Sequence, residues 1–131
     1  MKALDTNVIV RFLVADDAGQ AARVRELFQY AEDRREALFV PIVVMLETVW
    51  VLSAVYGINR EAVLDAVEKL AGLPFLRFEN AGLIIRWIAA GRQSTLDLAD
   101  LIIGLAARDN GCSVTVTLDR KSARSELFEL L

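Results

Sequence analysis

The sequence contains no histidine, one cysteine (Cys112) and two prolines among its 131 residues. Histidine is the usual general base, a common zinc ligand and the phosphorelay residue, so any chemistry here must rest on carboxylates, hydroxyls and cations. With no histidine to activate it, we expect Cys112 to be a small core residue. The start of the chain does not resemble an export signal because Asp5 interrupts its short apolar stretch, and with one cysteine this predicts a cytoplasmic protein.

The chain also lacks an excess of positive charge. Its formal net charge is −3 and its pI is about 5.0. A protein that binds nucleic acid by electrostatics alone is normally basic, so this class is disfavoured. The acidic balance does not exclude a nuclease that neutralises phosphate with bound cations.

Apolar residues are abundant, at 55% of the chain with a mean hydropathy of +0.39. The longest apolar run extends from Leu38 to Tyr56, with Pro41 near its start and Glu47 near its middle. A carboxylate at the centre of a membrane helix costs roughly 2.5–3.5 kcal/mol on insertion scales. We therefore interpret the run as part of a compact domain and expect no membrane span.

Short strand-like runs alternate with longer helical ones, and no repeat or linker interrupts them. This pattern predicts a single domain over residues 1–131, in which strands separated by helices pair in parallel. The expected fold class is α/β, a three-layer sandwich with a central parallel sheet of four to five strands. The predicted strands are Lys2–Leu4, Leu38–Val40, Phe75–Phe78, Ser113–Leu118 and Phe128–Leu130. The predicted helices are Asn7–Val14, Gln20–Arg35, one beginning at Pro41, Arg60–Leu70, Ala81–Arg92 and Leu96–Asn110.

Two acidic residues come at the ends of predicted strands. Asp5 closes the first strand, and Asp119 closes Ser113–Leu118. Each has a simpler interpretation as a helix cap or turn residue. However, ligands bind outside the carboxyl ends of parallel strands, and both acids are expected at the same edge of one sheet. This coincidence favours a functional site.

Two further carboxylates stand among apolar residues. Glu47 lies in a helix that is apolar nearly all round, where a buried carboxylate needs a cation, hydrogen-bond donors or a proton. A core ion pair with a distant arginine is the structural alternative. Asp100 is too far into its helix to cap it, whereas Ser94-x-x-Asp97 matches a capping box. Gly104, one turn after Asp100, is expected to leave room for a ligand.

Converging carboxylates repel one another unless cations lie between them. Ligands that are all oxygen favour Mg²⁺ or Mn²⁺ over zinc. Such an ion can bind a scissile phosphate and activate water, so an acidic cluster of this kind indicates phosphodiester hydrolysis.

Four segments of the chain resemble, in the expected order, the acidic motifs of VapC-type toxins of the PIN-domain family. They are Leu4–Arg11 with Asp16 and Asp17 beyond it, Val44–Leu52, Asp97–Ile103 and Thr115–Lys121. The resemblance runs from Met1 to about Ser125. One departure is Leu98, where an aromatic residue is common, and it affects no expected ligand.

The resemblance implies a PIN fold, Mg²⁺- or Mn²⁺-dependent endoribonuclease activity on RNA, a homodimer or higher oligomer, and inhibition by an antitoxin protein. Asp5 and Asp100 would be the principal metal ligands. Glu47 would complete the first site or orient its water, and Asp119 would hold a second ion or position water. The residues that would hydrogen-bond these ligands are Thr6, Asn7, Asp97 and Thr117.

Other side chains are candidates for contacts with partners. The apolar surplus suggests a covered surface, although core packing is the simpler interpretation of its candidate anchors, which are Trp50, Trp87 and Tyr56. Basic side chains expected near the carboxyl edge of the sheet could contact RNA, and they are Arg11, Arg120, Lys121 and Arg124.

Two alternative functions stay open. A non-catalytic α/β module that binds RNA or protein would take up no metal, and Asp5→Asn would not change its activity. An aspartate-based phosphotransfer domain would need a second acid close to Asp5, in an Asp-x-Asp pair or in paired acids directly after the strand. Here Thr6 and Asn7 follow, and this function gives no task to Glu47 or Asp100.

Overall fold

The computed structural model describes residues Met1 to Leu131, which form two compact units, Met1–Ala81 and Gly82–Leu131, here called the N-terminal and C-terminal units. The N-terminal unit holds β1 (Lys2–Ala3), α1 (Thr6–Val14), α2 (Ala18–Arg34), β2 (Leu38–Val40), α3 (Ile42–Ala54), α4 (Arg60–Ala71) and β3 (Leu76–Phe78). α5 (Ala81–Gln93) begins at the boundary. The C-terminal unit continues with α6 (Leu98–Asp109), β4 (Thr115–Thr117), the 3₁₀ turn η1 (Ser122–Arg124) and β5 (Phe128–Leu130).

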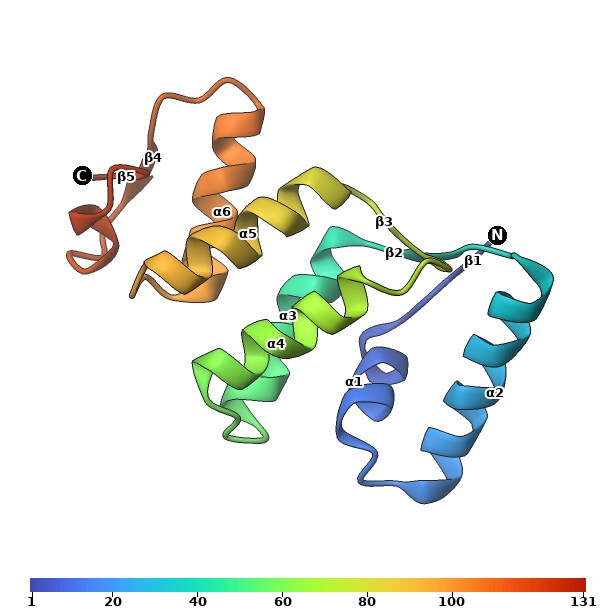
Figure 1. Cartoon of the computed structure of the whole chain (residues 1–131). Helices are drawn as coiled ribbons and strands as arrows, with labels where there is room; N and C mark the ends of the chain where they lie inside the picture. Colours follow the sequence, from blue (N-terminus) through green and yellow to red (C-terminus); the bar gives the residue numbers. More distant parts are fainter. The chain divides into compact units, whose positions relative to one another are not determined.

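The strands form two parallel sheets, one in each unit (Figure 1). In the N-terminal unit the order is β1-β2-β3, and Leu38 pairs with Lys2 on one side and with Leu76 on the other. In the C-terminal unit β4 pairs with β5, with Thr115 opposite Phe128. The α/β class and the parallel pairing are confirmed. The expected single sheet of four to five strands is wrong, because the hydrogen-bond ladders join three strands and two strands separately.

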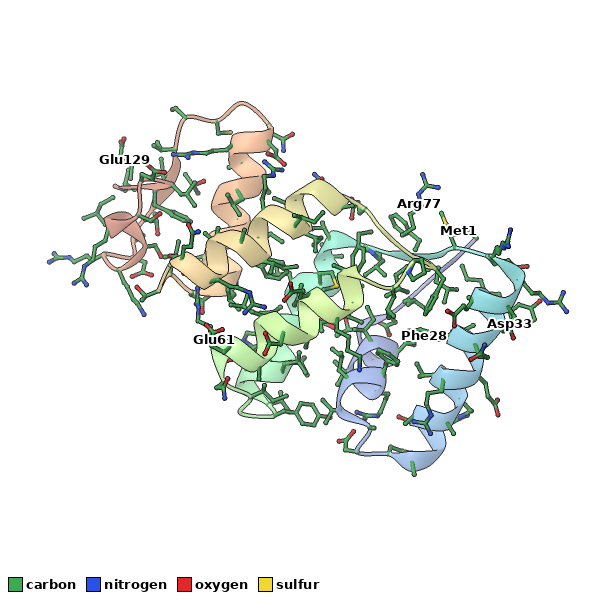
Figure 2. The ribbon with its side chains drawn as sticks, viewed as in Figure 1. Met1, Phe28, Asp33, Glu61, Arg77 and Glu129 are labelled. Carbon is green, nitrogen blue, oxygen red and sulfur yellow. The ribbon has the colours of Figure 1, made fainter.

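Aromatic packing builds the core of the N-terminal unit. One of the packed rings comes from α2, a helix that begins after Asp17, whose side chain accepts a hydrogen bond from the backbone of Gln20. The buried Phe28 of α2 lies on the side of this helix that faces α1 (Figure 2). Its ring centroid is 4.7 Å from that of Phe12 on α1 and 5.2 Å from that of Phe75, just before β3. One side chain thus joins both helices to the sheet.

The apolar run from Leu38 to Tyr56 becomes β2 and α3, as expected. α3 is covered on one side only: Met45, Thr48 and Leu52 are fully buried, whereas Val43 is 66% and Trp50 58% exposed. A helix with apolar residues on every side is therefore not buried on every side. None of the helices combines the length and the apolar character needed to cross a membrane.

In the C-terminal unit, α5 is fastened to the start of α6 by Trp87. This side chain is 1% exposed, and its indole Nε1 donates a hydrogen bond to the carbonyl of Leu98 at 2.8 Å. The core interpretation is therefore correct for Trp87, while Trp50 is exposed. The turn after α6 uses Gly111 at a positive φ of 85°, and Cys112 beyond it is exposed. The expectation of a buried Cys112 is wrong, because it lies in this surface turn.

Gly104 allows close packing of α6 against the segment that leads into β5. A Cβ atom at this position would lie 2.9 Å from Leu127 Cβ and 3.1 Å from Phe128 Cε2. The space beside this glycine is therefore filled by the protein itself. The expectation that it admits a ligand is wrong.

We expect Gly104→Ala to lower the free energy of unfolding by about 1–2 kcal/mol, because overpacking outweighs the roughly 1 kcal/mol that alanine gains in a helix. Urea denaturation measures this change. Gly19→Ala in α2 is the matched control, since its Cβ would have no neighbour nearer than 3.6 Å. Equal stability of the two variants would show that the contact with Leu127 is not limiting.

Candidate active site

The residues predicted to form the site divide between the two units. Asp5, Thr6, Asn7 and Glu47 belong to the N-terminal unit, and Asp97, Asp100, Thr117 and Asp119 to the C-terminal unit. Within neither unit do three or more acidic or sulfur side chains converge on one point. The meeting of all four proposed ligands therefore stays a prediction.

Asp5 is the N-cap of α1. Its backbone is extended (φ −87°, ψ 161°), and its Oδ1 accepts a hydrogen bond from the backbone of Thr6 at 2.7 Å. The cap interpretation is thus correct, but it uses one carboxylate oxygen and leaves Oδ2 without a protein partner. A cap of this kind uses a side-chain oxygen to satisfy a backbone N–H group that the first turn of a helix leaves free. Asp5 is exposed, Thr6 is buried and Asn7 is exposed, with no hydrogen bond from the Asn7 side chain.

Glu47 lies on the exposed side of α3, between Val43 and Trp50 along the same helical face. It forms no ion pair, so a core pair with a distant arginine is also wrong. The expectation of a buried carboxylate failed because α3 turns Thr48 and Met45, rather than Glu47, toward the core. A site role for Glu47 therefore no longer follows from its burial and rests on the motif in which it stands.

Asp97 is the N-cap of α6. Its Oδ1 accepts hydrogen bonds from the backbone of Ala99 at 2.9 Å and of Asp100 at 3.3 Å. The capping box predicted from Ser94 is wrong, since Ser94 Oγ accepts from the backbone of Leu96 instead and α6 begins after Asp97. This cap fixes the first turn of α6 and so positions Asp100, whose side chain is half-buried.

Ser122 brings Asp100 and Asp119 together. Its side chain is 2% exposed, and its Oγ lies 2.8 Å from Asp119 Oδ2 and 3.1 Å from Asp100 Oδ2. Asp119 is held at two further points: its Oδ1 accepts from the backbone of Lys121, and its own backbone donates to Thr117 Oγ1, both at 3.0 Å. The predicted association of Thr117 with Asp119 is thus present, through the backbone of the acid.

The motif pattern did not single out Ser122. The available signal was its position three residues after Asp119, because serine and aspartate side chains readily form local hydrogen bonds within a tight turn. Without coordinates, the same serine is an ordinary loop residue. Its burial and its second contact, with Asp100 on α6, make it a candidate site residue.

The Ser122 hydroxyl has one hydrogen to share between two carboxylate oxygens. Its hydrogen bond to Asp119, followed by the bond from the Lys121 backbone, lowers the pKa of Asp119 below its ordinary value of 3.8. Two acidic side chains thus share one donor, which cannot balance the charge of both. A divalent cation fits this arrangement, and an all-oxygen donor set suits Mg²⁺ or Mn²⁺.

The family model for the PIN domain matches residues 2–126, so the chain belongs to the PIN domain family. The chain is also similar to a VapC ribonuclease of Aquifex aeolicus (strain VF5), with 26% identity over 121 residues, which are 92% of this chain and 89% of that protein. No solved structure matches the chain. The resemblance inferred from the four acidic motifs is confirmed.

We expect Ser122→Ala to raise the pKa of Asp119 toward 3.8, because the mutation removes the largest cause of its lowering. A lowered carboxyl pKa stabilises the fold above the unfolded-state pKa, and this contribution is lost as pH falls through the folded-state pKa. The variant should therefore lose less stability on acidification. Carboxyl-carbon NMR titration, with the signal assigned through Asp119→Asn, measures the pKa. Ser53→Ala, at an exposed position, is the control, and an unmoved Asp119 titration in Ser122→Ala would contradict the assignment.

Proposed function

We propose that the chain is a divalent-metal-dependent endoribonuclease, and that residues 1–131 act as a single PIN domain. The observation that supports this most is the pair of acids held by Ser122, in a chain that belongs to the PIN domain family and is similar to a VapC ribonuclease. Hydrolysis of RNA phosphodiester bonds is the reaction that fits both this donor set and the relative.

Mg²⁺ or Mn²⁺ would be held by Asp5 and Asp100, with Glu47 completing the site and Asp119 holding a second ion or a water. The ion, when bound, supplies Lewis-acid polarisation of a phosphoryl oxygen and neutralises developing negative charge. The protein's own part is to fix the ligands before the substrate arrives. In Asp5, the Thr6 backbone holds Oδ1 and so orients the carboxylate, while Oδ2 has no protein partner and is available to an ion.

Supporting groups in the C-terminal unit restrict the movement of two of the proposed ligands. Ser122 holds one oxygen of each carboxylate, while Asp97 and Thr117 hold the backbones of Asp100 and Asp119. Held side chains lose less conformational entropy on binding a cation, and their oxygens stay aimed at one place. Asn7 makes no such bond, and its role rests on the motif alone.

We further propose that the nuclease is the toxin of a toxin–antitoxin pair, acting in the cytoplasm as a homodimer or higher oligomer. The resemblance to VapC-type toxins supports this. The exposed apolar side chains Val43 and Trp50, on the same face of α3 as Glu47, give a protein partner an apolar contact surface. An antitoxin seated there would lie next to one of the proposed catalytic acids.

Asp5→Asn and Asp100→Asn should each reduce RNA cleavage by at least about 100-fold, because even residues that only support a metal ligand contribute 10–100-fold. Both should also weaken Mn²⁺ binding in calorimetry, and a chelator should stop cleavage by the wild type. The measurement is the rate of cleavage of a fluorescent RNA at fixed Mg²⁺. Asp33→Asn is the matched control, since Asp33 lies on the outer side of α2, hydrogen-bonded to Gln29 (Figure 2).

The alternatives predict different results. Cleavage that survives chelator, or that is equal in wild type, Asp5→Asn and Asp100→Asn, would exclude the metal-dependent mechanism. A binding module would retain RNA or protein binding with no metal uptake and no cleavage. A phosphotransfer domain would form an acid-stable, alkali-labile aspartyl phosphate with a small phosphodonor, and Asp5→Asn would abolish it.

A further inference from the structure

A cavity of about 170 Å³ lies in the C-terminal unit, between the segment that precedes α6 and the segment around η1. This exceeds by far the roughly 10–15 Å³ that one water molecule needs. Its lining is contiguous in the chain with the acid pair: Leu96 precedes the α6 cap, and Lys121 and Arg124 flank Ser122. The remaining lining residues are Ser94, Thr95 and Ser125.

The chemistry of this lining suits an anion. It contains two cationic side chains and three hydroxyls, and it contains no carboxylate. Lys121 and Arg124 are exposed, and neither side chain takes part in an ion pair. Ser125 Oγ accepts a hydrogen bond from the backbone of Leu127, so its own hydrogen stays available to a ligand.

Two arginines elsewhere in the chain are engaged by acidic or polar groups. Arg11 binds Asp16, Gln20 and Tyr56, and its candidacy as an RNA contact is therefore weakened. Arg86 forms a two-point pair with Asp109 at 2.7 and 2.6 Å. Lys121 and Arg124, by contrast, are cations without an ion pair that line one cavity beside the acid pair.

We propose that this cavity binds a backbone phosphate of single-stranded RNA, next to the phosphate at the acidic site. Arg124 presents a planar fork that matches two phosphate oxygens, and Lys121 adds a point charge. Thr95 and Ser125 supply hydroxyl donors. Because phosphate contacts carry no sequence information, the cavity fixes the position of the strand and leaves base choice to other groups. This inference rests on the proposed function for the identity of the polyanion.

The test measures binding of a labelled single-stranded RNA by fluorescence anisotropy, with chelator present so that no cleavage occurs, over a range of KCl concentrations. Lys121→Gln and Arg124→Gln should each weaken binding about three- to tenfold, as expected for loss of one partly exposed charged contact. Each should also reduce the slope of log affinity against log salt by about 0.7, the value for one phosphate contact on a single strand.

Arg25→Gln is the matched control. Arg25 is exposed on α2, and its loss changes the net charge by the same amount, but it does not line the cavity. It should change the affinity less than twofold. An equal effect of all three variants would show general electrostatic attraction and overturn the proposal, as would unchanged binding in the double variant Lys121→Gln/Arg124→Gln.

Two further measurements identify the chemical group that the cavity binds. Single-stranded DNA of the same sequence should lose affinity by the same factor as RNA, because a phosphate contact does not involve the 2′-hydroxyl; a loss confined to RNA would overturn a phosphate site. Inorganic phosphate should compete with RNA on wild type but not on the double variant, and equal competition on both would overturn it. If the proposed nuclease function is wrong, the wild type will show no metal-dependent cleavage of RNA. That result is independent of the binding measurements described here.

Discussion

The hydrogen bonds of the Ser122 hydroxyl are the constraint on which the C-terminal half of the candidate site depends. Asp100 comes from the first turn of α6 and Asp119 from the turn after β4, and only the Oγ of Ser122 touches both carboxylates. Since this serine is almost completely buried, little water is present to replace it. The close approach of Gly104 in α6 to Leu127 packs the same helix against the segment that leads into β5. The spacing of the two acids is therefore set by the fold, before any cation binds.

Negative and positive side chains lie close together along the chain beside this acid pair, but they face different places. Asp119 and its partner Asp100 concentrate negative charge, and within five residues Lys121 and Arg124 line a cavity without carboxylates. In the proposed nuclease, such a separation would let an acidic protein approach a polyanion, because the cations would hold one phosphate while the acids held the metal that acts on another. A net charge of −3 therefore says little about this neighbourhood.

Local sequence patterns predicted the elements well and their assembly poorly. Leu38–Val40 and Phe128–Leu130 were expected as strands and are strands with those bounds, since a short apolar run and a short apolar–polar alternation both favour extended backbone. Which strands pair depends on contacts distant in sequence, so the grouping into sheets of three and two was not predictable. The same limit explains Glu47: composition showed that α3 is apolar nearly all round, but only packing decides which side is covered. Asp97 and Asp119 were expected at turns and caps, and their hydrogen bonds are there.

Arg11 shows why charge alone does not identify the side chains that are available to a ligand. Its Nη1 donates to both Asp16 Oδ1 and the Tyr56 hydroxyl at 3.0 Å, and that hydroxyl donates in turn to Asp16 Oδ2 at 2.9 Å. The Tyr56 hydrogen bond, with the charge of Asp16, raises the pKa of Arg11. This closed ring ties α1, at the point where Ala15 turns into the left-handed region, to the end of α3. Because Asp5 caps α1 and α3 carries Glu47, the Arg11 guanidinium fixes the helices of the N-terminal acids relative to each other. Recruiting the Arg11 guanidinium to a phosphate would break this ring and loosen both helices. In the proposed nuclease, the cations that face RNA would therefore be ones that take no part in holding the fold.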